Sequence, residues 1–466
     1  MIGPMRIAVR RETAEGERRV ALVPDTVAKL VAEEHEVVVE SGAGGDFYPD
    51  EAYEDAGAKI ARKDAPADAD VVLAVNAPAE KEIETLAEGS LLVCFLDPSA
   101  QEEILQRLAE RRVTVFSMSS IPRTGAAQAM DAISSMSSVA GYQSVLMAAQ
   151  AAGRYLPMMS TAAGTTKAAK VLVLGVGVAG LQAIATARRL GAEVEAFDIR
   201  PEVGDQVRSL GATFIEAQDE DDQRSADQES GEQGPEIGRA ETFVKALLGL
   251  PPELGHRSRK PQPGADRDAS AGEGEGKGDG DRKGEGAREG DGKGEGDREG
   301  DRKGEADREG DRKGKQEAGQ ARGGYASEQD EEKQRRDQEL MTERLGEMDV
   351  VLTTALVPGK RAPTLVTTEM VERMKPGAVL FDLAVEAGGN CELSEPGEVV
   401  THGHVRIHGP LNLPSTMPMH ASHLLSRNLA AVLSHLIGED GELALDFDDE
   451  ITSGAVLAHD GEVRNR

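Results

Sequence analysis

Short apolar runs alternate with amphipathic stretches along the first part of the chain. The pattern predicts a helix over 24–32 and strands over 5–9, 37–40, 71–75, 91–95 and 113–116. Strands that alternate with helices are typical of a parallel sheet covered by helices. Residues 1–125 are therefore predicted to form a doubly wound, Rossmann-like α/β lobe.

A second series of the same kind follows a long helical run over 126–152. Its helix is expected at 181–190 and its strands at 171–174, 193–197, 349–354, 378–382 and 399–407. We expect 126–160 to join two lobes, and 161–217 with 323–419 to form the second Rossmann-like lobe. A helix over 421–437, within the segment 420–440, is expected to complete the first lobe.

Residues 218–322 interrupt the second series. They repeat Gly, Asp, Arg, Lys and Glu almost without apolar side chains, so they cannot build a core. Because strands on both sides continue one series, the pattern predicts a long, disordered, acidic and glycine-rich insertion inside the second lobe.

The strand over 171–174 runs into a G-x-G-x-x-G turn. In such a turn Gly175 permits the tight bend, Gly177 lets a pyrophosphate approach the backbone, and Gly180 lets the next helix pack closely. Val178 and Ala179 bring the helix N-terminus to the phosphates. The turn indicates a dinucleotide site; the alternative is a glycine-rich turn without a ligand.

An acidic residue follows the next strand, about twenty residues further on. The carboxylate of Asp198 can accept hydrogen bonds from ribose hydroxyls and repels a 2′-phosphate, which favours NAD(H) over NADP(H). Ile199 and Arg200 come next and are also expected to bind the cofactor, although the positive charge of Arg200 weakens that preference.

The chain is strongly acidic, with a formal net charge of −31. Residues 217–330 hold about 30 acids and 20 bases, which leaves a net charge of about −21 on the rest. This spread acidity resembles the surface of a halophilic protein, and it argues against nucleic acid as a partner.

The two cysteines, Cys94 and Cys391, form neither a disulfide framework nor a metal pair, and a reduced, cytoplasmic chain is expected. No apolar run is long enough to span a bilayer. The histidines between 402 and 423 lack the spacing of a metal site.

A polar group precedes the long helical run. Gln128, Asp131 and Ser134 fall at three-residue steps, so they are expected on one helix face with Arg123 just ahead. They are candidates for a site between the lobes; the alternative is an ordinary helix start with solvated polar groups.

These motifs together resemble one known family. The similarity rests on 123–135, 140–142, 175–180 with 197–201, 353–360 and 382–391. They resemble the NAD(H)-binding alpha subunit, domain I, of proton-translocating NAD(P) transhydrogenase, in the alanine dehydrogenase/transhydrogenase superfamily. The resemblance implies a Re/Si-specific enzyme in which NAD(H) lies in a cleft between the lobes and hydride passes to NADP⁺ on another subunit.

The resemblance also implies roles for the polar group. Arg123 and Asp131 would hold one another and orient the nicotinamide carboxamide. Ser134 would support it, and Gln128 would reach toward the nucleotide of the partner.

By the same resemblance, further residues line the cofactor. They are Thr354, Ala355, Leu356, Glu386, Asn390 and the lid residue Tyr325 in the stretch 323–326. The insertion, placed just before that lid, departs from the family pattern.

Two other functions are compatible with the fold. An alanine dehydrogenase-like enzyme needs an acid or base and a cationic anchor for the keto acid, because reductive amination moves protons. Where related dehydrogenases have a Lys-Glu-Pro stretch and a His, this chain has residues 76–78 and 95–97, without either group. The other alternative is a non-catalytic NAD-binding scaffold. Hydride transfer between two nicotinamides needs no proton donor, which favours the transhydrogenase interpretation.

The resemblance implies partners as well. They are a membrane-spanning subunit and an NADP(H)-binding beta subunit. The chain itself is expected to be a homodimer, peripheral to the inner face of the cell membrane.

Overall fold

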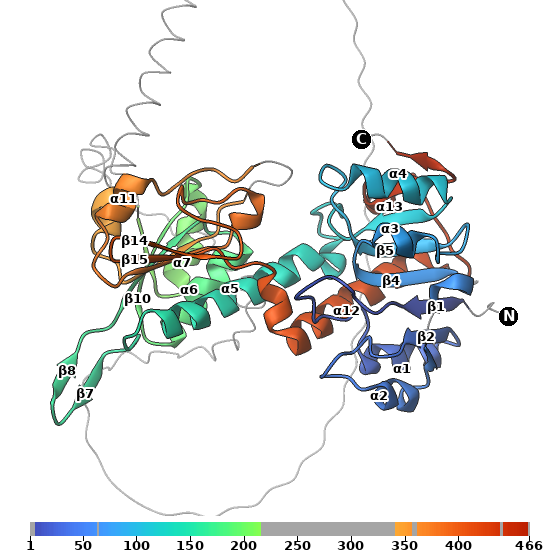
Figure 1. The fold of residues 1–466 in the computed structure, drawn as a ribbon, viewed down its shortest axis with the longest axis horizontal. Coiled ribbons are helices and arrows are strands. Elements are labelled where there is room, and N and C mark those ends of the chain that lie inside the picture. The colour runs from blue at the N-terminus through green and yellow to red at the C-terminus, as the bar shows by residue number, and fades with distance from the viewer. Residues whose placement is uncertain (1–4, 63–64, 216–340, 357–360, 439–440, 465–466) are drawn as a thin grey trace, which may run out of the picture. The chain divides into compact units, whose positions relative to one another are not determined.

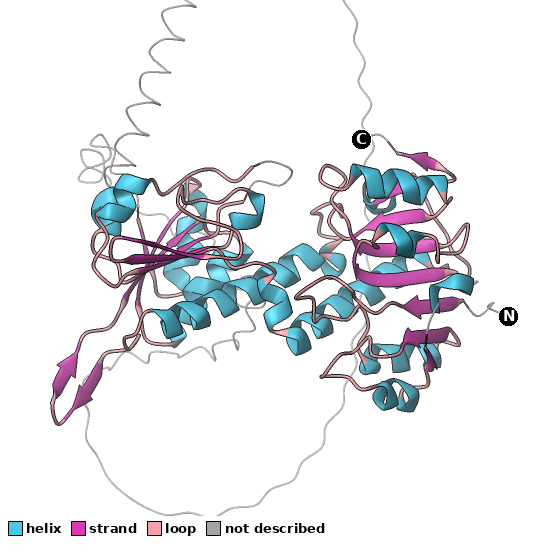
Figure 2. Cartoon of the chain, viewed as in Figure 1, coloured by secondary structure: helices cyan, strands magenta, loops and turns pink. Residues whose placement is uncertain are grey.

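The computed structural model describes residues 5–62, 65–215, 341–356, 361–438 and 441–464. The predicted insertion over 218–322 and the lid residue Tyr325 lie outside the described residues. The described part contains two large β-sheets and one separate two-stranded hairpin (Figure 1; Figure 2). The α/β class with two Rossmann-like sheets, predicted from the alternating pattern, is confirmed.

The first sheet has eight strands in the order β17-β16-β6-β5-β4-β1-β2-β3. The pairs from β6 to β3 are parallel, and β16 and β17 add an antiparallel edge that the pattern did not predict. The strands are β1 (Arg6–Val9), β2 (Glu36–Glu40), β3 (Lys59–Ala61), β4 (Val71–Asn76), β5 (Leu91–Phe95), β6 (Thr114–Ser117), β16 (Val456–His459) and β17 (Glu462–Val463). The strand order reverses between β1 and β4, which is the switch point where ligands of such sheets bind.

Both faces of the first sheet are buried. Ile7 and Val9 face one core, and Ala8 between them faces another, as the two-residue period of a strand requires. The helical elements that belong to these cores or to the loops of this sheet are α1 (Pro24–Ala32), α2 (Asp50–Asp55), η1 (Ala65–Asp68), α3 (Glu80–Ile83), α4 (Glu102–Glu110), α12 (Pro418–Leu436) and α13 (Glu450–Ala455).

The second sheet has seven strands in the order β11-β10-β9-β12-β13-β15-β14. They are β9 (Lys170–Leu174), β10 (Glu193–Phe197), β11 (Thr213–Phe214), β12 (Val350–Thr353), β13 (Val379–Asp382), β14 (Val399–His402) and β15 (Val405–His408). All neighbours are parallel except β14 and β15. The strand region predicted over 399–407 consists of two strands rather than one, because a turn at Gly403, with φ of 57°, folds this segment into an antiparallel pair.

The second sheet continues across the undescribed stretch. β11 precedes that stretch and β12 follows it, and both belong to the same sheet. Further helical elements of the described residues are α6 (Val178–Arg189), η3 (Pro201–Val203), α7 (Gly204–Ser209), α11 (Thr368–Glu372), η4 (Val385–Ala387) and η5 (Leu413–Thr416).

A long helix, α5 (Ala132–Ala151), contributes to both cores. Ala132, Met136 and Val139 pack with the first sheet, whereas Val145 and Ala148 pack with the second. The helix predicted over 126–152 begins later than expected, after a separate turn η2 (Gln128–Met130).

The hairpin consists of β7 (Met159–Thr161) and β8 (Gly164–Thr166), which the sequence pattern did not predict. It extends away from the second sheet (Figure 1), and every residue of both strands is exposed. Among the described helices, none combines the length and apolar character that crossing a bilayer requires.

Candidate functional site

The glycine turn lies at the switch point of the second sheet, where β9 pairs with β10 on one side and β12 on the other. β9 ends at Leu174, Gly175 adopts a φ of +97°, and α6 begins at Val178 with Gly177 as its N-cap. The predicted strand, turn and helix therefore follow one another as the fingerprint requires.

The three fingerprint glycines meet different surroundings. A side chain on Gly180 would begin 2.0 Å from the carbonyl oxygen of Gly175, and one on Gly175 would begin 2.9 Å from the backbone nitrogen of Ala355. A side chain on Gly177 would meet no atom of the described residues within 4 Å. Packing of the protein thus requires two of the glycines, while the third borders open space.

That open space adjoins the N-terminus of α6. No side chain in the described part of the chain caps this twelve-residue helix, so its first amide groups, from Val178 to Gly180, are available to an anion. Open space at Gly177 and uncapped amides on a helix N-terminus fit a pyrophosphate, and the donor set therefore fits the dinucleotide inferred from the sequence.

Asp198 lies directly after β10 and faces the same turn. Its Oδ2 accepts a hydrogen bond of 2.6 Å from the amide of Val176. The guanidinium of Arg200 donates a hydrogen bond to each carboxylate oxygen, from Nε to Oδ1 at 2.9 Å and from Nη2 to Oδ2 at 3.0 Å. Burial opposes ionisation of Asp198, but hydrogen bonds from Arg200 and Val176 outweigh it and hold the pKa of this carboxyl below its usual value.

Asp198 is therefore ionised, but the guanidinium of Arg200 shields its carboxylate from solvent. Its side chain is 7% exposed, whereas that of Arg200 is 51% exposed. A ribose that bonds to this carboxylate has to displace the guanidinium, which can turn outward into solvent. Ile199 between them is 84% exposed and offers an apolar surface beside the carboxylate.

The segment after β12 supports the glycine turn. The hydroxyl of Thr354 donates to the carbonyl oxygen of Gly175 over 2.8 Å, and the amide of Thr354 bonds to the carbonyl oxygen of Leu174. Ala355 is held by the side chain of Asn390, which accepts from its amide over 3.0 Å and donates to its carbonyl oxygen over 2.9 Å. Leu356, the next residue, is 55% exposed.

A buried carboxylate that the sequence pattern did not reveal organises this segment. Asp382 ends β13 and is fully buried. It accepts hydrogen bonds from the hydroxyl of Thr353 and from the amides of Ala384, Asn390 and Cys391, at 2.8 to 3.0 Å. A polar residue at the carboxyl end of a buried parallel strand was the signal that could have identified it.

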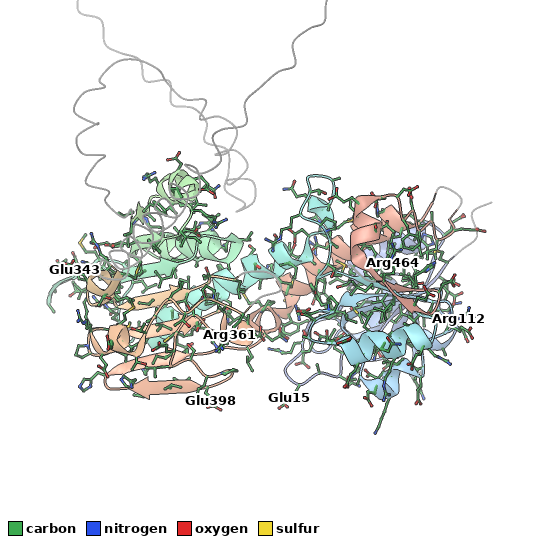
Figure 3. All side chains as sticks on the ribbon, turned by 90° about the horizontal axis from the view of Figure 1, so that it is seen from above. Glu15, Arg112, Glu343, Arg361, Glu398 and Arg464 are labelled. Carbon is green, nitrogen blue, oxygen red and sulfur yellow. The ribbon has the colours of Figure 1, made fainter. Side chains whose placement is uncertain are left out.

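The loop after β13 carries Glu386, which is exposed and accepts a hydrogen bond of 3.1 Å from the amide of Asn412. Gly388 in this loop has a φ of +101°, and a side chain there would begin 2.7 Å from Cγ of Arg361, which is labelled in Figure 3. Residues 357–360 and Tyr325 lie outside the described residues.

The polar group before α5 differs from the expected helix face. Asp131 is the N-cap of α5, with its Oδ1 bonded to the amide of Ser134 at 2.9 Å and its Oδ2 bonded to the hydroxyl of Ser134 at 2.6 Å. Gln128 lies on the preceding turn η2 and is exposed, as is Arg123. Among the described residues no hydrogen bond or ion pair joins Arg123 to Asp131, and of the four predicted residues only Asp131 and Ser134 are joined by hydrogen bonds.

A glycine within α5 docks this helix onto the fingerprint helix. A side chain on Gly141 would begin 2.2 Å from the carbonyl oxygen of Ala179, in the first turn of α6. Glycine inside a helix costs about 1 kcal/mol relative to alanine, and here it permits the close approach of two backbones. The polar group at the start of α5 is thereby held in a fixed register with the glycine turn.

A second polar cluster lies at the carboxyl end of the first sheet. Glu17, whose side chain is fully buried, accepts from Arg19, from Asn76 at 3.0 Å, and from Asn412 at 3.1 Å. Burial alone would raise the pKa of Glu17, but the hydrogen bonds and charge of Arg19 lower it to about 2. The positive charge of Arg19 is thus balanced by the carboxylate of Glu17. The side-chain amide of Asn76 also donates a hydrogen bond to Glu12.

Residues 76–78 and 95–97 follow the ends of two neighbouring strands at this cluster. Asn76 ends β4 and pairs with Phe95 at the end of β5. Asp97, which follows β5, bonds to the amide and hydroxyl of Ser99 and is exposed. The positions that lacked a Lys and a His in the sequence are thus filled by amide and carboxylate groups with their own partners.

Among the described residues, no group of three or more His, Cys, Asp or Glu side chains could hold a metal ion. Both cysteines are free and buried, and burial raises the pKa of the Cys94 thiol to about 12.

Comparison with known proteins agrees with this geometry. The sequence model of the alanine dehydrogenase/PNT C-terminal domain matches residues 144–466, and that of the N-terminal domain matches residues 8–140. The chain is 37% identical over 468 residues to an NAD(P) transhydrogenase subunit alpha chain of Rhodospirillum rubrum, covering 98% of this chain and 97% of the relative. It is 35% identical to NAD(P) transhydrogenase subunit alpha of Haemophilus influenzae, covering 98% and 71%.

A solved structure agrees as well. The transhydrogenase from Sinorhizobium meliloti matches with a TM-score of 0.69 and 33% identity, over 98% of each chain. With both family domains matched in order and relatives aligned along nearly the whole length, the chain belongs to the alanine dehydrogenase/PNT family.

Proposed function

We propose that this chain binds NAD(H) at the carboxyl edge of its second sheet and exchanges a hydride with NADP(H) bound on a partner subunit. The observation that carries the proposal is the open space at Gly177, bordered by the uncapped N-terminus of α6 and by the carboxylate of Asp198. The relatives named NAD(P) transhydrogenase subunit alpha support the choice of reaction.

The residues of the chain would act by binding and orienting. The amides of Val178 to Gly180 would bind the pyrophosphate, and Asp198 would accept from the ribose once Arg200 turns away. Thr354 and Asn390 keep the glycine turn and Ala355 in place, and Leu356, Glu386 and Ile199 would line the bound nucleotide.

When bound, the nicotinamide supplies the hydride. Asp131 and Ser134 are already joined at the start of α5, and we propose that Arg123 and Gln128 complete the group around the ring. Direct hydride transfer requires two rings at near-attack distance and exclusion of water, and no proton has to move. The segment 123–134 contains no His, Cys or Lys, which agrees with a reaction without a general acid or base.

An alanine dehydrogenase activity is the alternative with the same fold. It would need a cationic anchor and a proton donor near the ends of β4 and β5. There Arg19 is paired with Glu17, and Asn76 donates to both Glu12 and Glu17. These contacts leave no free cation among the described side chains of this cluster, and they favour the transhydrogenase reaction.

We also propose the assembly that this reaction requires. The named relatives are alpha subunits, so the partners would be an NADP(H)-binding beta subunit and a membrane-spanning subunit, with this chain peripheral to the inner face of the cell membrane. The hairpin of β7 and β8 supports a homodimer, because its strands are exposed on every residue and Met158 beside it is 66% exposed.

The decisive experiment compares two assays of the purified chain. With NADH and NADP⁺, and with the NADP(H)-binding partner added, hydride transfer is expected, and Asp131→Asn should reduce its rate severely while NADH still binds. With NADH, pyruvate and ammonium, no NADH oxidation is expected. Steady oxidation in the second assay would establish the dehydrogenase alternative, and a wild type that binds NADH without hydride transfer in either assay would favour a non-catalytic scaffold. An unaffected rate in Asp131→Asn would contradict the role proposed for Asp131.

A further inference from the structure

The turn η2, which carries Gln128 immediately ahead of Asp131, is held from a distant part of the chain. The side-chain amide of Asn428, on α12, donates a hydrogen bond of 2.8 Å to the carbonyl oxygen of Ala129. Because a carbonyl oxygen can only accept, the Nδ2 atom must face the turn and the Oδ1 atom must face away from it.

The Oδ1 atom of Asn428 is buried and has no hydrogen-bond partner among the described residues. The residue as a whole is only 7% exposed. A buried acceptor without a donor destabilises a fold, so an apolar side chain of similar size would serve the packing of α12 at least as well. The presence of an amide therefore needs a reason other than stability.

The neighbours of Asn428 on α12 show what a structural polar residue looks like in this helix. The hydroxyl of Ser422, 1% exposed, accepts from the amide of Val20 at 3.0 Å, and that of Ser426 accepts from the amide of Val23 at 3.1 Å. These two hydroxyls satisfy buried backbone amides. The carbonyl group that Asn428 binds belongs instead to Ala129, a residue that is itself exposed.

From these contacts we infer that Asn428 is a positioning residue of the hydride-transfer site, acting through the carbonyl group of Ala129 on the turn that presents Gln128 and leads into Asp131. The inference rests on the proposed function. Without the bond from Asn428, the turn keeps the packing of Met130 in the first core and short-range backbone hydrogen bonds, including a weak one of 3.5 Å from the amide of Gln128 to the carbonyl oxygen of Gly125.

The test exchanges Asn428 for leucine, which fills a similar volume without a donor, and uses Ser422→Ala in the same helix as the matched control. In the complex with the NADP(H)-binding partner, Asn428→Leu is expected to lower kcat for hydride transfer from NADH to NADP⁺ at least tenfold. The Kd for NADH should stay within twofold, and the melting temperature should be unchanged or higher. Ser422→Ala should show the reverse, with a lower melting temperature and an unchanged kcat.

A second measurement needs no activity. Amide hydrogen exchange over residues 126–131 should become faster in Asn428→Leu and stay as in the wild type in Ser422→Ala. Unchanged exchange and unchanged kcat in Asn428→Leu would overturn the inference. Loss of stability in step with activity would also overturn it, because it would show a merely structural role. If the wild type binds NADH but transfers no hydride to NADP⁺, the proposed function fails, whatever the exchange rates show.

Discussion

The switch points of the two sheets begin from the same arrangement. In the first sheet, Glu40 ends β2 and accepts a hydrogen bond of 2.8 Å from the amide of Arg11, two residues beyond β1. In the second sheet, Asp198 follows β10 and accepts one of 2.6 Å from the amide of Val176, two residues beyond β9. Each sheet therefore has an acid at the end of its second strand and a crevice at its carboxyl edge.

The two crevices differ in the residues that come after the first strand. After β1, the buried guanidinium of Arg10 binds Glu82 at 2.8 Å, and Glu12 accepts from the amide of Val75 at 2.6 Å. After β9, the corresponding positions are Gly175 and Gly177, and the space beside Gly177 is open. Strand order supplies a crevice in both sheets, and the residues after the first strand decide whether charged side chains or glycines line it.

The largest expected effect tests a buried charge in the polar cluster at the carboxyl end of the first sheet. Glu17→Gln should lower the free energy of unfolding by ~3 kcal/mol at neutral pH, because the ordinary pKa of 4.5 falls to about 2 in the fold. For a carboxyl with a depressed pKa, this contribution is present above the unfolded value and is lost as pH falls from 4.5 through about 2. Urea unfolding at pH 7 and at pH 3 measures it, and an equal difference between wild type and variant at both values would contradict the assignment.

Glu12 provides the control, because its pKa is shifted in the direction opposite to that of Glu17. Burial raises the pKa of Glu12 above 4.5, more than the hydrogen bonds from Val75 and Asn76 lower it. Its contribution to stability is therefore present at low pH and lost as pH rises through the folded value. Glu12→Gln should leave stability at pH 7 unchanged or higher, and a loss there would show that this carboxylate is needed in its charged form.

The next largest effect tests the open second crevice. Gly177→Val should weaken NADH binding about a hundredfold by filling the space in front of α6, with an unchanged melting temperature. Gly180→Val should instead lower the melting temperature, because its side chain would meet the carbonyl oxygen of Gly175. Titration calorimetry and thermal unfolding separate the two outcomes, and normal NADH binding by Gly177→Val would mean that the phosphates lie elsewhere.

The contact between α5 and α6 should give a smaller change in stability. Gly141→Ala is expected to lower the free energy of unfolding by about 2 kcal/mol, because overpacking against Ala179 outweighs the gain in helix propensity. Gln150→Ala, at an exposed position of the same helix, is the control and should change little. A more stable Gly141→Ala variant in urea unfolding would show that the two helices can separate at no cost.

The smallest expected effect concerns the guanidinium that covers Asp198. Arg200→Ala should tighten NADH binding about threefold, because a half-exposed ion pair of this kind is worth at most about 1 kcal/mol. It should weaken NADPH binding, because the positive charge beside the ribose is lost. Weaker NADH binding by the variant would mean that Arg200 contacts the nucleotide rather than competing with it.

Local patterns predicted much of this molecule. The helix Pro24–Ala32 and the strands Leu91–Phe95 and Glu193–Phe197 have the bounds that the sequence indicated, because a proline start and an unbroken apolar run are local signals. Local sequence signals gave a wrong prediction where a side-chain hydrogen bond sets the start of a helix. Asp131 accepts from the amide of Ser134 and ends the turn before α5, so the helix face predicted from three-residue steps does not form.

The sequence by itself determined the two α/β lobes, the glycine turn and the acid after β10, since apolar periodicity and glycine spacing act over a few residues. Only the tertiary structure decided which charges line the first crevice, that Asp382 and Asn390 hold the segment after β12, and that Asn428 holds Ala129. The Asn428 contact joins residues 299 positions apart, and the contacts of Glu17 reach Asn76 and Asn412. Such pairs depend on how whole elements pack, and no repeat along the chain encodes them.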